Sequence, residues 1–298
     1  MTSNVLATVW KASLGFSLLA TISIILLSAS TAKAGTTLTI TQSTCPIVID
    51  QPGEYSLATD VGPCAPGADG IDIAASNVTL HLFGHTIAGA ATVGTCDNAL
   101  GISISSSGSM LTNVNVLGPA TINNFVFGFN AANSANSSVK FVNVNANCPD
   151  LGGATGLEID PPGGHWTLQG NVVRGPGDTT AGIVLSQVNN NIVVRNNVND
   201  SITMFRSDNN VIVANTANDN FGGIILLGSH NNQVIANTTS NNRDFSGILI
   251  FGNSGGNNFS GNKSFNNLPF DMEDDNPNCG TNTWQGNKFN LASQPCIH

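Results

Sequence analysis

Two carboxylates, a histidine and an arginine lie close together in the middle of the sequence. Glu158 and Asp160 are separated by one residue, His165 follows the turn sequence Pro161-Pro162-Gly163-Gly164, and Arg174 comes shortly after. Alternate residues of a β-strand point to the same side, so both carboxylates would project outward together. A base and a cation on one face can take the proton beside a uronate carboxylate and neutralise that carboxylate. These four are therefore the candidate catalytic residues, although solvated acids before a turn are the simpler interpretation.

Further arginines fall on successive repeats of the sequence. Arg195 and Arg206 are the candidate ligand-binding residues because, with Arg174 and Arg243, they could face an acidic sugar. Their positions within the repeat differ: Arg195 precedes a repeated asparagine, Arg206 follows an expected strand, and Arg243 lies in a loop. The sequence therefore does not indicate that they share one site.

Four acidic residues near the end of the sequence have side chains that Ca²⁺ prefers, since calcium is bound by several carboxylate oxygens. These residues are Asp271, Glu273, Asp274 and Asp275. A solvated terminal turn is the alternative interpretation. A copper carrier would need clustered His, Met or Cys, and only His81 and His85 lie close together. No cofactor is therefore expected, with calcium left open.

An internal repeat carries these candidate residues. Five copies of an Asn-x-apolar-x-x-Asn pattern end at Asn196, Asn215, Asn237, Asn262 and Asn287, in steps of 19, 22, 25 and 25 residues. Asn171 extends the series backwards by 25 residues. An apolar residue stands three positions before each of these asparagines: Leu168, Val193, Ile212, Val234, Phe259 and Trp284. Regular steps of this length are typical of a solenoid.

A second pattern, Gly-apolar-x-apolar, alternates with the first. It begins at Gly70, Gly101, Gly156, Gly182, Gly223 and Gly247, with Ser201 filling one gap and Gly128 marking a degenerate copy. Strands of about four residues with a period of two cannot bury a core alone, but stacked turns can. The sequence therefore predicts an all-β, single-domain parallel β-helix of about 8–10 turns.

The repeated asparagine has a physical reason in such a fold. Asn tolerates left-handed backbone angles at a sharp bend. Turns stacked about 4.8 Å apart let identical amides hydrogen-bond along a column. We expect one such asparagine ladder, with one asparagine per turn, made of Asn171, Asn196, Asn215, Asn237, Asn262 and Asn287.

The outward position of the Gly-apolar-x-apolar strands changes in character along the chain. It is occupied by Asp72, Ser103, Glu158, Val184, Thr203, Ile225 and Leu249, with Asp271 expected next. The apolar stretch in the middle is more typical of a covered face than of an active site. A loop, a partner or another subunit could cover it.

Both repeat patterns resemble those of the right-handed parallel β-helix, or pectin-lyase-like, superfamily. The resemblance extends over residues 65–290. Residues 75–87 look like the first turn of many secreted bacterial β-helix proteins, and residues 274–284 look like their C-terminal turn. The repeats are also similar to those of the periplasmic copper-associated β-helix family of nitrous oxide reductase maturation and of alginate epimerases. This resemblance implies a right-handed solenoid, but fold does not imply function.

The motifs of enzymes with this fold are missing from the sequence. It contains no polygalacturonase-like N-T-D, D-D, G-H-G and R-I-K set, no epimerase-like Y-G-x-D-P-H and no W-x-D-H of pectate lyases. Its single tyrosine, Tyr55, precedes the repeats. The absent motifs favour binding without catalysis.

The six cysteines indicate an oxidising compartment, where an even number suggests disulfides. Proximity in the sequence favours Cys45–Cys64 and Cys279–Cys296, which leaves Cys96–Cys148. No C-x-x-C pattern supports zinc or thioredoxin-like chemistry.

The first 34 residues are typical of an export signal, with Lys11, an apolar run over 14–27 and the cleavage pattern Ala32-Lys33-Ala34. An uncleaved anchor is the alternative, although the run is short for a membrane span. Residues 35–64 would then form an N-terminal cap and 65–298 the β-helix, with its last turn locked by a disulfide. Loss of the two leader lysines would change the net charge from −9 to −11.

Charge and composition restrict the function further. Nine Lys+Arg in an acidic chain cannot form a surface that binds nucleic acid. We expect a secreted or periplasmic protein that binds a polysaccharide or cell-surface partner without catalysis. It would have no membrane contact beyond the leader, and it could form an oligomer through the apolar outer face. A polysaccharide lyase or epimerase with an atypical site, acting on uronate polymers, is the alternative.

Overall fold

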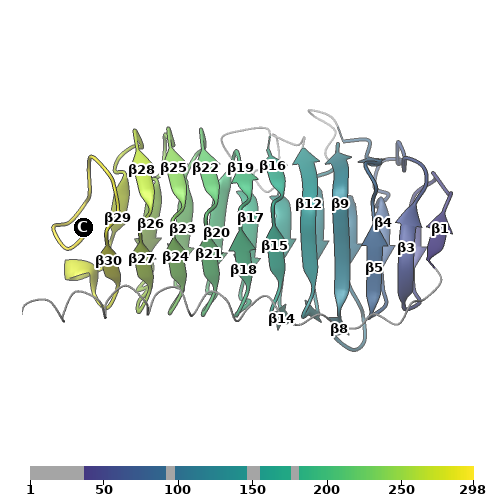
Figure 1. The fold of residues 1–298 in the computed structure, drawn as a ribbon, viewed down its shortest axis with the longest axis horizontal. Helices are drawn as coiled ribbons and strands as arrows, with labels where there is room; N and C mark the ends of the chain where they lie inside the picture. The colour runs from purple at the N-terminus through teal and green to yellow at the C-terminus, as the bar shows by residue number, and fades with distance from the viewer. Residues whose placement is uncertain (1–36, 92–97, 146–154, 176–180) are drawn as a thin grey trace, which may run out of the picture. The chain divides into compact units, whose positions relative to one another are not determined.

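The described residues form a right-handed parallel β-helix, as predicted from the repeats (Figure 1). The computed structural model describes residues 37–91, 98–145, 155–175 and 181–298. A ten-stranded sheet contributes one strand per turn, which confirms the expected 8–10 turns. The predicted leader, 1–34, and the predicted bridge Cys96–Cys148 lie outside the described residues. Among the described residues, no helix is long and apolar enough to span a membrane.

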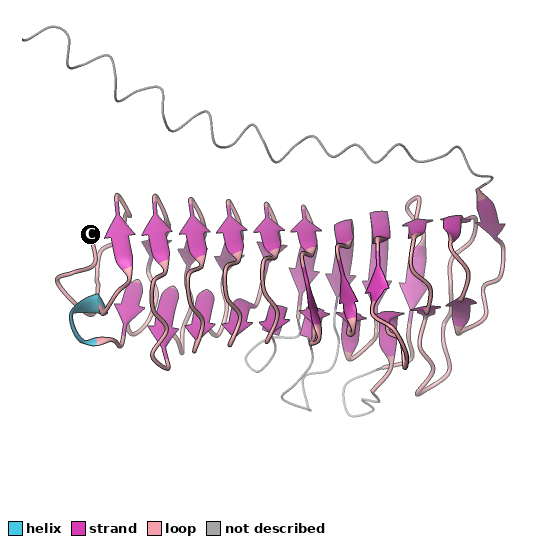
Figure 2. Cartoon of the chain, turned by 90° about the horizontal axis from the view of Figure 1, so that it is seen from below, coloured by secondary structure: helices cyan, strands magenta, loops and turns pink. Residues whose placement is uncertain are grey.

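Three parallel sheets follow the axis. Sheet A has seventeen strands: β1 Leu38–Ile40, β3 Gly53–Leu57, β5 Val78–His81, β6 Thr86–Ala88, β9 Val114–Asn123, β12 Ser138–Asn145, β15 Thr167–Gln169, β16 Val172–Arg174, β18 Ile192–Val194, β19 Asn197–Val198, β21 Val211–Val213, β22 Thr216–Asn218, β24 Gln233–Ile235, β25 Thr238–Ser240, β27 Asn258–Ser260, β28 Lys263–Phe265 and β30 Thr283–Gln285. Sheet B has ten strands: β2 Ile47–Ile49, β4 Ile71–Ile73, β7 Leu100–Ile104, β10 Phe127–Ala131, β13 Thr155–Ile159, β17 Ala181–Ser186, β20 Ser201–Phe205, β23 Ile224–Leu227, β26 Ile248–Phe251 and β29 Met272–Asp274. Sheet C has three short strands at a corner: β8 Leu111–Thr112, β11 Ser134–Ala135 and β14 Gly163–Gly164. Figure 2 shows the single short 3-10 turn of the described residues, η2 Pro277–Cys279, close to the C-terminus.

The core lies inside the coil and is built from the apolar columns. The six residues of the predicted apolar column are all buried and stack on consecutive turns. At the C-terminal end, the rings of Phe259 and Trp284 stack with centroids 4.1 Å apart. Burying a large apolar side chain contributes roughly 1.5–3 kcal/mol. The stacking of turns therefore supplies the core that no single turn could form.

The predicted asparagine ladder is present. In each step, one asparagine donates both its backbone N–H and its Nδ2 to Oδ1 of the asparagine on the next turn. For Asn196 and Asn215 the two distances are 2.9 and 3.0 Å. Nδ2 of Asn196 also donates to the Leu168 carbonyl at 2.9 Å. The buried amides are therefore paired, as buried polar groups must be.

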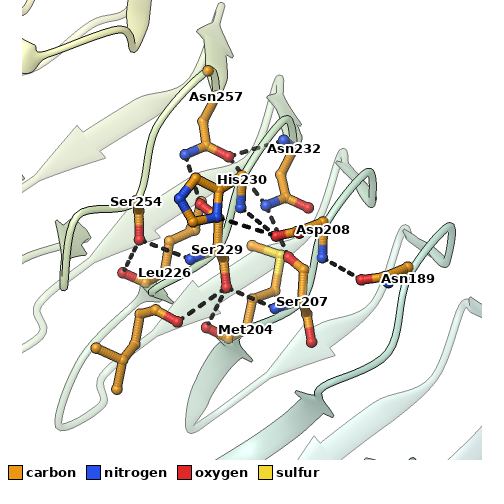
Figure 3. Close-up of polar contacts among 12 residues, drawn as sticks. Asn189, Met204, Ser207, Asp208, Leu226, Ser229, His230, Asn232, Ser254 and Asn257 are labelled. Atoms are coloured by element: carbon orange, nitrogen blue, oxygen red, sulfur yellow. Dashed lines mark hydrogen bonds and ion pairs between the residues drawn. The ribbon is translucent and has the colours of Figure 1, made fainter. Parts of the chain in front are cut away.

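The expectation of one ladder asparagine per turn was wrong, because two further asparagine ladders exist, together with a column of serines. The first asparagines of the repeat form a ladder of their own, through Asn191, Asn210, Asn232, Asn257 and Asn282. A third ladder joins Asn220, Asn242 and Asn267. Ser207, Ser229 and Ser254 form a hydroxyl column in which each oxygen accepts a backbone N–H from the preceding turn (Figure 3). Each corner of the coil has orphan backbone donors, so each needs its own column of acceptors.

The left-handed bend lies at the residue before the ladder asparagine, so the expectation that the asparagine itself adopts it was wrong. Arg195, Ala214 and Ala236 occupy this corner on successive turns with φ of 55°, 56° and 53°. Left-handed backbone is costly for most residues. The closed amide ladder beside each bend offsets that cost.

The two disulfides at the ends of the coil are the predicted ones. Cys45–Cys64 and Cys279–Cys296 have Cα atoms 5.3 and 6.1 Å apart. The coil begins earlier than residue 65: β1 pairs with β3, and β2 pairs in register with β4. The segment expected to form a cap thus supplies the first strands of the solenoid.

Candidate functional site

The outer face of sheet B carries one continuous column of outward positions, which the strand register defines. The column contains Val48, Asp72, Ser103, Asn130, Glu158, Val184, Thr203, Ile225, Leu249 and Glu273. The prediction of Asp271 at its end was wrong. Glu273 stands opposite Leu249, and Asp271 precedes the strand with its side chain buried. Asn130 occupies the outward position in the degenerate Gly-apolar-x-apolar copy that begins at Gly128.

A pocket of about 450 Å³ opens on this face over three neighbouring turns. Its lining combines apolar and polar side chains: Leu100, Phe127, Thr155, Asn130, Glu158 and Asp160. The first three occupy equivalent positions on β7, β10 and β13, as the pairings of Phe127 with Leu100 and Thr155 show. The carboxylates and the amide lie further along the strands. The pocket therefore has an apolar end and an acidic end.

The two carboxylates of the pocket differ in their surroundings. Nδ2 of Asn130 donates to Oδ2 of Asp160 at 2.8 Å, which holds this carboxylate in place. Burial, and after it the charge of Asp160, raise the pKa of Glu158 to about 7, although a hydrogen bond from Thr155 partly opposes both effects. Glu158 is therefore able to carry or release a proton near neutral pH.

The structure brings Glu158 and Asp160 together but places the other two candidate catalytic residues elsewhere. His165 is exposed, with φ of 57°, in the turn between β14 and β15. Arg174 ends β16 in sheet A, where Nη1 donates to Oδ1 of Asn143 at 3.2 Å. Neither side chain lines the pocket that the described residues form.

The two candidate ligand-binding arginines lie on different sheets. Arg195 is exposed at the left-handed corner between β18 and β19 of sheet A. Arg206 follows β20 of sheet B, and its guanidinium lies over the Phe205 ring at 4.9 Å. They do not converge on one surface position.

Two of the four candidate calcium ligands are buried hydrogen-bond acceptors. Oδ1 of Asp271 accepts from the backbone and side chain of Asn267, and Oδ2 accepts two backbone N–H groups. Oδ2 of Asp274 accepts from Nδ2 of Asn282 at 2.9 Å and from Nε1 of Trp284 at 3.3 Å. Both carboxylates thus terminate asparagine ladders.

The other two acidic residues of this group have separate surroundings. Glu273 accepts a hydrogen bond from the Ser246 hydroxyl, and Asp275 is exposed. Within the described ranges, no three His, Cys, Asp or Glu side chains converge as metal ligands would.

Two apolar residues of the outer column, Ile225 and Leu249, are covered by neighbouring loops of the same chain, whereas Val184 is half-buried. Ile225 and Leu249 are only 9% and 6% exposed. Phe221 and Phe245, in the loops that lead into β23 and β26, pack edge to face with ring centroids 4.7 Å apart. A Cβ on Gly222 would lie 2.9 Å from both Ile225 and Phe245, so the loop packs closely against the sheet. A loop therefore covers Ile225 and Leu249, and a partner or another subunit over the remaining face stays a prediction.

Sequence reasoning missed four residues of the pocket: Leu100, Phe127, Asn130 and Thr155. A signal for all four was present. Leu100, Phe127 and Thr155 each precede the glycine of a Gly-apolar-x-apolar copy, and Asn130 is the third residue of the copy that begins at Gly128. Alignment of the weak copy with its neighbours would have placed these residues beside Glu158.

Comparison with known proteins identifies the fold. No family model and no curated protein matches the sequence. The structure is similar to the periplasmic alginate epimerase AlgG, with a TM-score of 0.55 and 14% identity over 80% of this chain and 68% of that one. It is also similar to the A-module of the mannuronan C-5 epimerase AlgE6 from Azotobacter vinelandii, with a TM-score of 0.50 and 13% identity over 87% and 86% of the two chains. For the polygalacturonase from Erwinia carotovora ssp. carotovora the values are 0.51 and 11% over 91% and 99%. At these identities the likeness shows the pectin-lyase-like fold alone.

Proposed function

We propose that this protein is an exported β-helix that binds a polysaccharide, free or on a cell surface, through the sheet B pocket without chemically changing it. The observation that carries the proposal is the pocket over β7, β10 and β13. Its apolar end, with Leu100 and Phe127, suits the C–H face of a sugar ring, and its acidic end offers acceptors for hydroxyl groups. Sites of this kind are concave and mostly apolar, with a few placed polar groups.

Two further observations support this role. The solved structures with this fold include two epimerases and a polygalacturonase, whose names refer to polysaccharides. The two disulfides suit an oxidising, extracytoplasmic compartment. Export would bring the pocket into contact with such polymers.

Binding is favoured over turnover because the groups for uronate chemistry do not assemble. A lyase or epimerase must neutralise a uronate carboxylate, and this needs a cation beside the base. No Lys, Arg or His lines the pocket within the described part of the chain. The raised pKa of Glu158 would suit a general acid or base, so catalysis is the outcome that the experiment must be able to detect.

The test measures binding and turnover on the same samples. Purified mature protein is titrated with neutral, acidic and amine-bearing oligosaccharides, and each mixture is assayed for new reducing ends, unsaturated products and epimerised residues. We expect binding that weakens when Phe127→Ala removes the apolar wall, without any product. Product formation that disappears in Glu158→Gln would establish an enzyme instead. Absence of both binding and products across the panel would exclude a glycan ligand and leave a protein surface partner.

A further inference from the structure

The acidic side chains of the sheet B pocket should favour polysaccharides of one charge over those of another. Two of its six lining side chains are carboxylates, and none of the others carries a positive charge. The segments outside the described residues that precede β7, β13 and β17 in the sequence (92–97, 146–154 and 176–180) contain no Lys, Arg or His. The whole chain is acidic as well, with a net charge of −9. A uronate carboxylate would therefore be repelled at this site.

We propose that the pocket binds a sugar that carries a protonated amine, so that the ligand is a polysaccharide with free amino groups. This inference rests on the proposed polysaccharide-binding function and names its substrate class. The ammonium group would lie between Glu158 and Asp160, and the ring would lie against Phe127 and Leu100.

The hydrogen bonds of the pocket suit this ligand. Asp160 uses Oδ2 to accept from Asn130, and among the described residues no donor is found for Oδ1. An ammonium group has three donors and no acceptor, so it matches carboxylate oxygens better than a sugar hydroxyl does. An N-acetylated sugar would instead bring an amide group, which has a single N–H donor and a carbonyl oxygen. That oxygen would lie unfavourably beside the two carboxylates.

The charged groups around Glu158 also favour a bound cation. The elements packed against β13 in the outer column contribute Asn130 from β10 and Val184 from β17, both uncharged. Asp72 is the next charged group of that column in the N-terminal direction, on β4, beyond Ser103. Asp160 is thus the main charged neighbour, and it disfavours ionisation of Glu158. A bound ammonium would reverse this effect, because an opposite charge favours the ionised acid.

Binding should therefore release a proton from the protein. At about pH 6, below the pKa of about 7 for Glu158, the carboxyl group is mostly protonated before the ligand arrives. An ammonium that ionises it sends that proton to solvent. At about pH 6, a ligand that lowers the pKa of Glu158 by about two units gains about tenfold in affinity through this linkage and releases most of one proton.

The experiment compares oligomers of glucosamine and of N-acetylglucosamine of equal length by calorimetry at about pH 6. Titrations in two buffers of different ionisation enthalpy give the number of protons released. We expect the glucosamine oligomer to bind at least about tenfold more tightly, with release of up to about one proton per site. Glu158→Gln should remove both the preference and the proton release. Asp275→Asn removes a unit charge at an exposed position outside the pocket, and it should change neither.

The possible results separate this inference from the proposed function. If the N-acetylated oligomer binds equally well without proton release, the amine class is wrong while polysaccharide binding stands. An equal loss in Glu158→Gln and Asp275→Asn would also overturn the inference, since it would indicate attraction by net charge alone. If neither oligomer nor any glycan of the panel binds, the proposed function itself fails.

Discussion

Oδ2 of Asp274 accepts a hydrogen bond from Nδ2 of Asn282 at 2.9 Å and thereby closes the asparagine ladder that starts at Asn191. Each asparagine of the ladder donates hydrogen bonds to Oδ1 of the asparagine on the next turn. The last asparagine therefore needs an acceptor that has no donors of its own to satisfy. A carboxylate has acceptors only. Asp271 terminates the third ladder in the same way, at Asn267.

Removal of this terminal acceptor should destabilise the last turn. Asp274→Ala leaves the indole N–H of Trp284 and one of the two Nδ2 protons of Asn282 without an acceptor, while Nδ2 keeps the Ser254 carbonyl. A buried unsatisfied donor costs roughly 1–3 kcal/mol. We expect a loss of that size in the free energy of unfolding, measured in urea with tryptophan fluorescence. The exposed Asp275→Asn should change it by less than about 0.5 kcal/mol, and a similar loss in both variants would contradict the role of Asp274.

A substitution within the ladder should be at least as damaging. Asn215→Leu removes the Oδ1 that accepts from the backbone N–H and Nδ2 of Asn196, and Oδ1 of Asn237 keeps only its backbone donor. We expect unfolding to become easier by roughly 1–3 kcal/mol. Asn199 is exposed and outside the columns, so Asn199→Leu serves as the control. An effect near zero for Asn215→Leu in denaturant titrations would disprove the structural role of the ladder.

The stability of the protein should depend on pH through Glu158. The pKa of its carboxyl group is raised from 4.5 to about 7, so the native state keeps a proton that the unfolded chain releases. The free energy of unfolding should therefore fall as the pH rises from 4.5 to 7 and level off above that range. Asp72, whose pKa is raised to about 6, adds a contribution of the same sign from 3.8 upwards. Glu158→Gln should flatten the slope between pH 6 and 7 in thermal unfolding, and an unchanged slope would show that Glu158 is not its source.

Loss of the C-terminal disulfide should loosen the end of the coil. Cys279 and Cys296 are 17 residues apart, and closing a loop of this length stabilises by about 3 kcal/mol in the chain-entropy model. The double variant Cys279→Ser/Cys296→Ser should therefore unfold at lower denaturant, with earlier exchange of the amides around Trp284. In the corresponding Cys45→Ser/Cys64→Ser variant, the amides around Trp284 should exchange as slowly as in the unmodified protein. If both variants affected Trp284 equally, the C-terminal disulfide would not act locally.

The fold could be predicted from the sequence because a β-helix repeats one local pattern on every turn. The asparagine and glycine patterns recur in steps close to one turn, so the ladder residues, the buried column and two disulfides could be read from spacing and proximity. Residues that share a column share an environment, and this makes prediction reliable wherever the period is kept.

The side chains that meet across neighbouring turns could not be predicted in this way, because they depend on how the turns stack. Asn130 and Phe127 on the preceding turn line the same pocket as Glu158. His165 and Arg174 lie beyond the next corners of the coil, away from this pocket. The register of the last strand places Glu273 outward and leaves Asp271 and Asp274 to close ladders. Loops of variable length separate these strands, so the separation of two residues in the sequence does not tell which residues lie side by side on one face of the coil. That position is fixed by the hydrogen bonds between strands, and a shift of one residue would exchange the inner and outer faces.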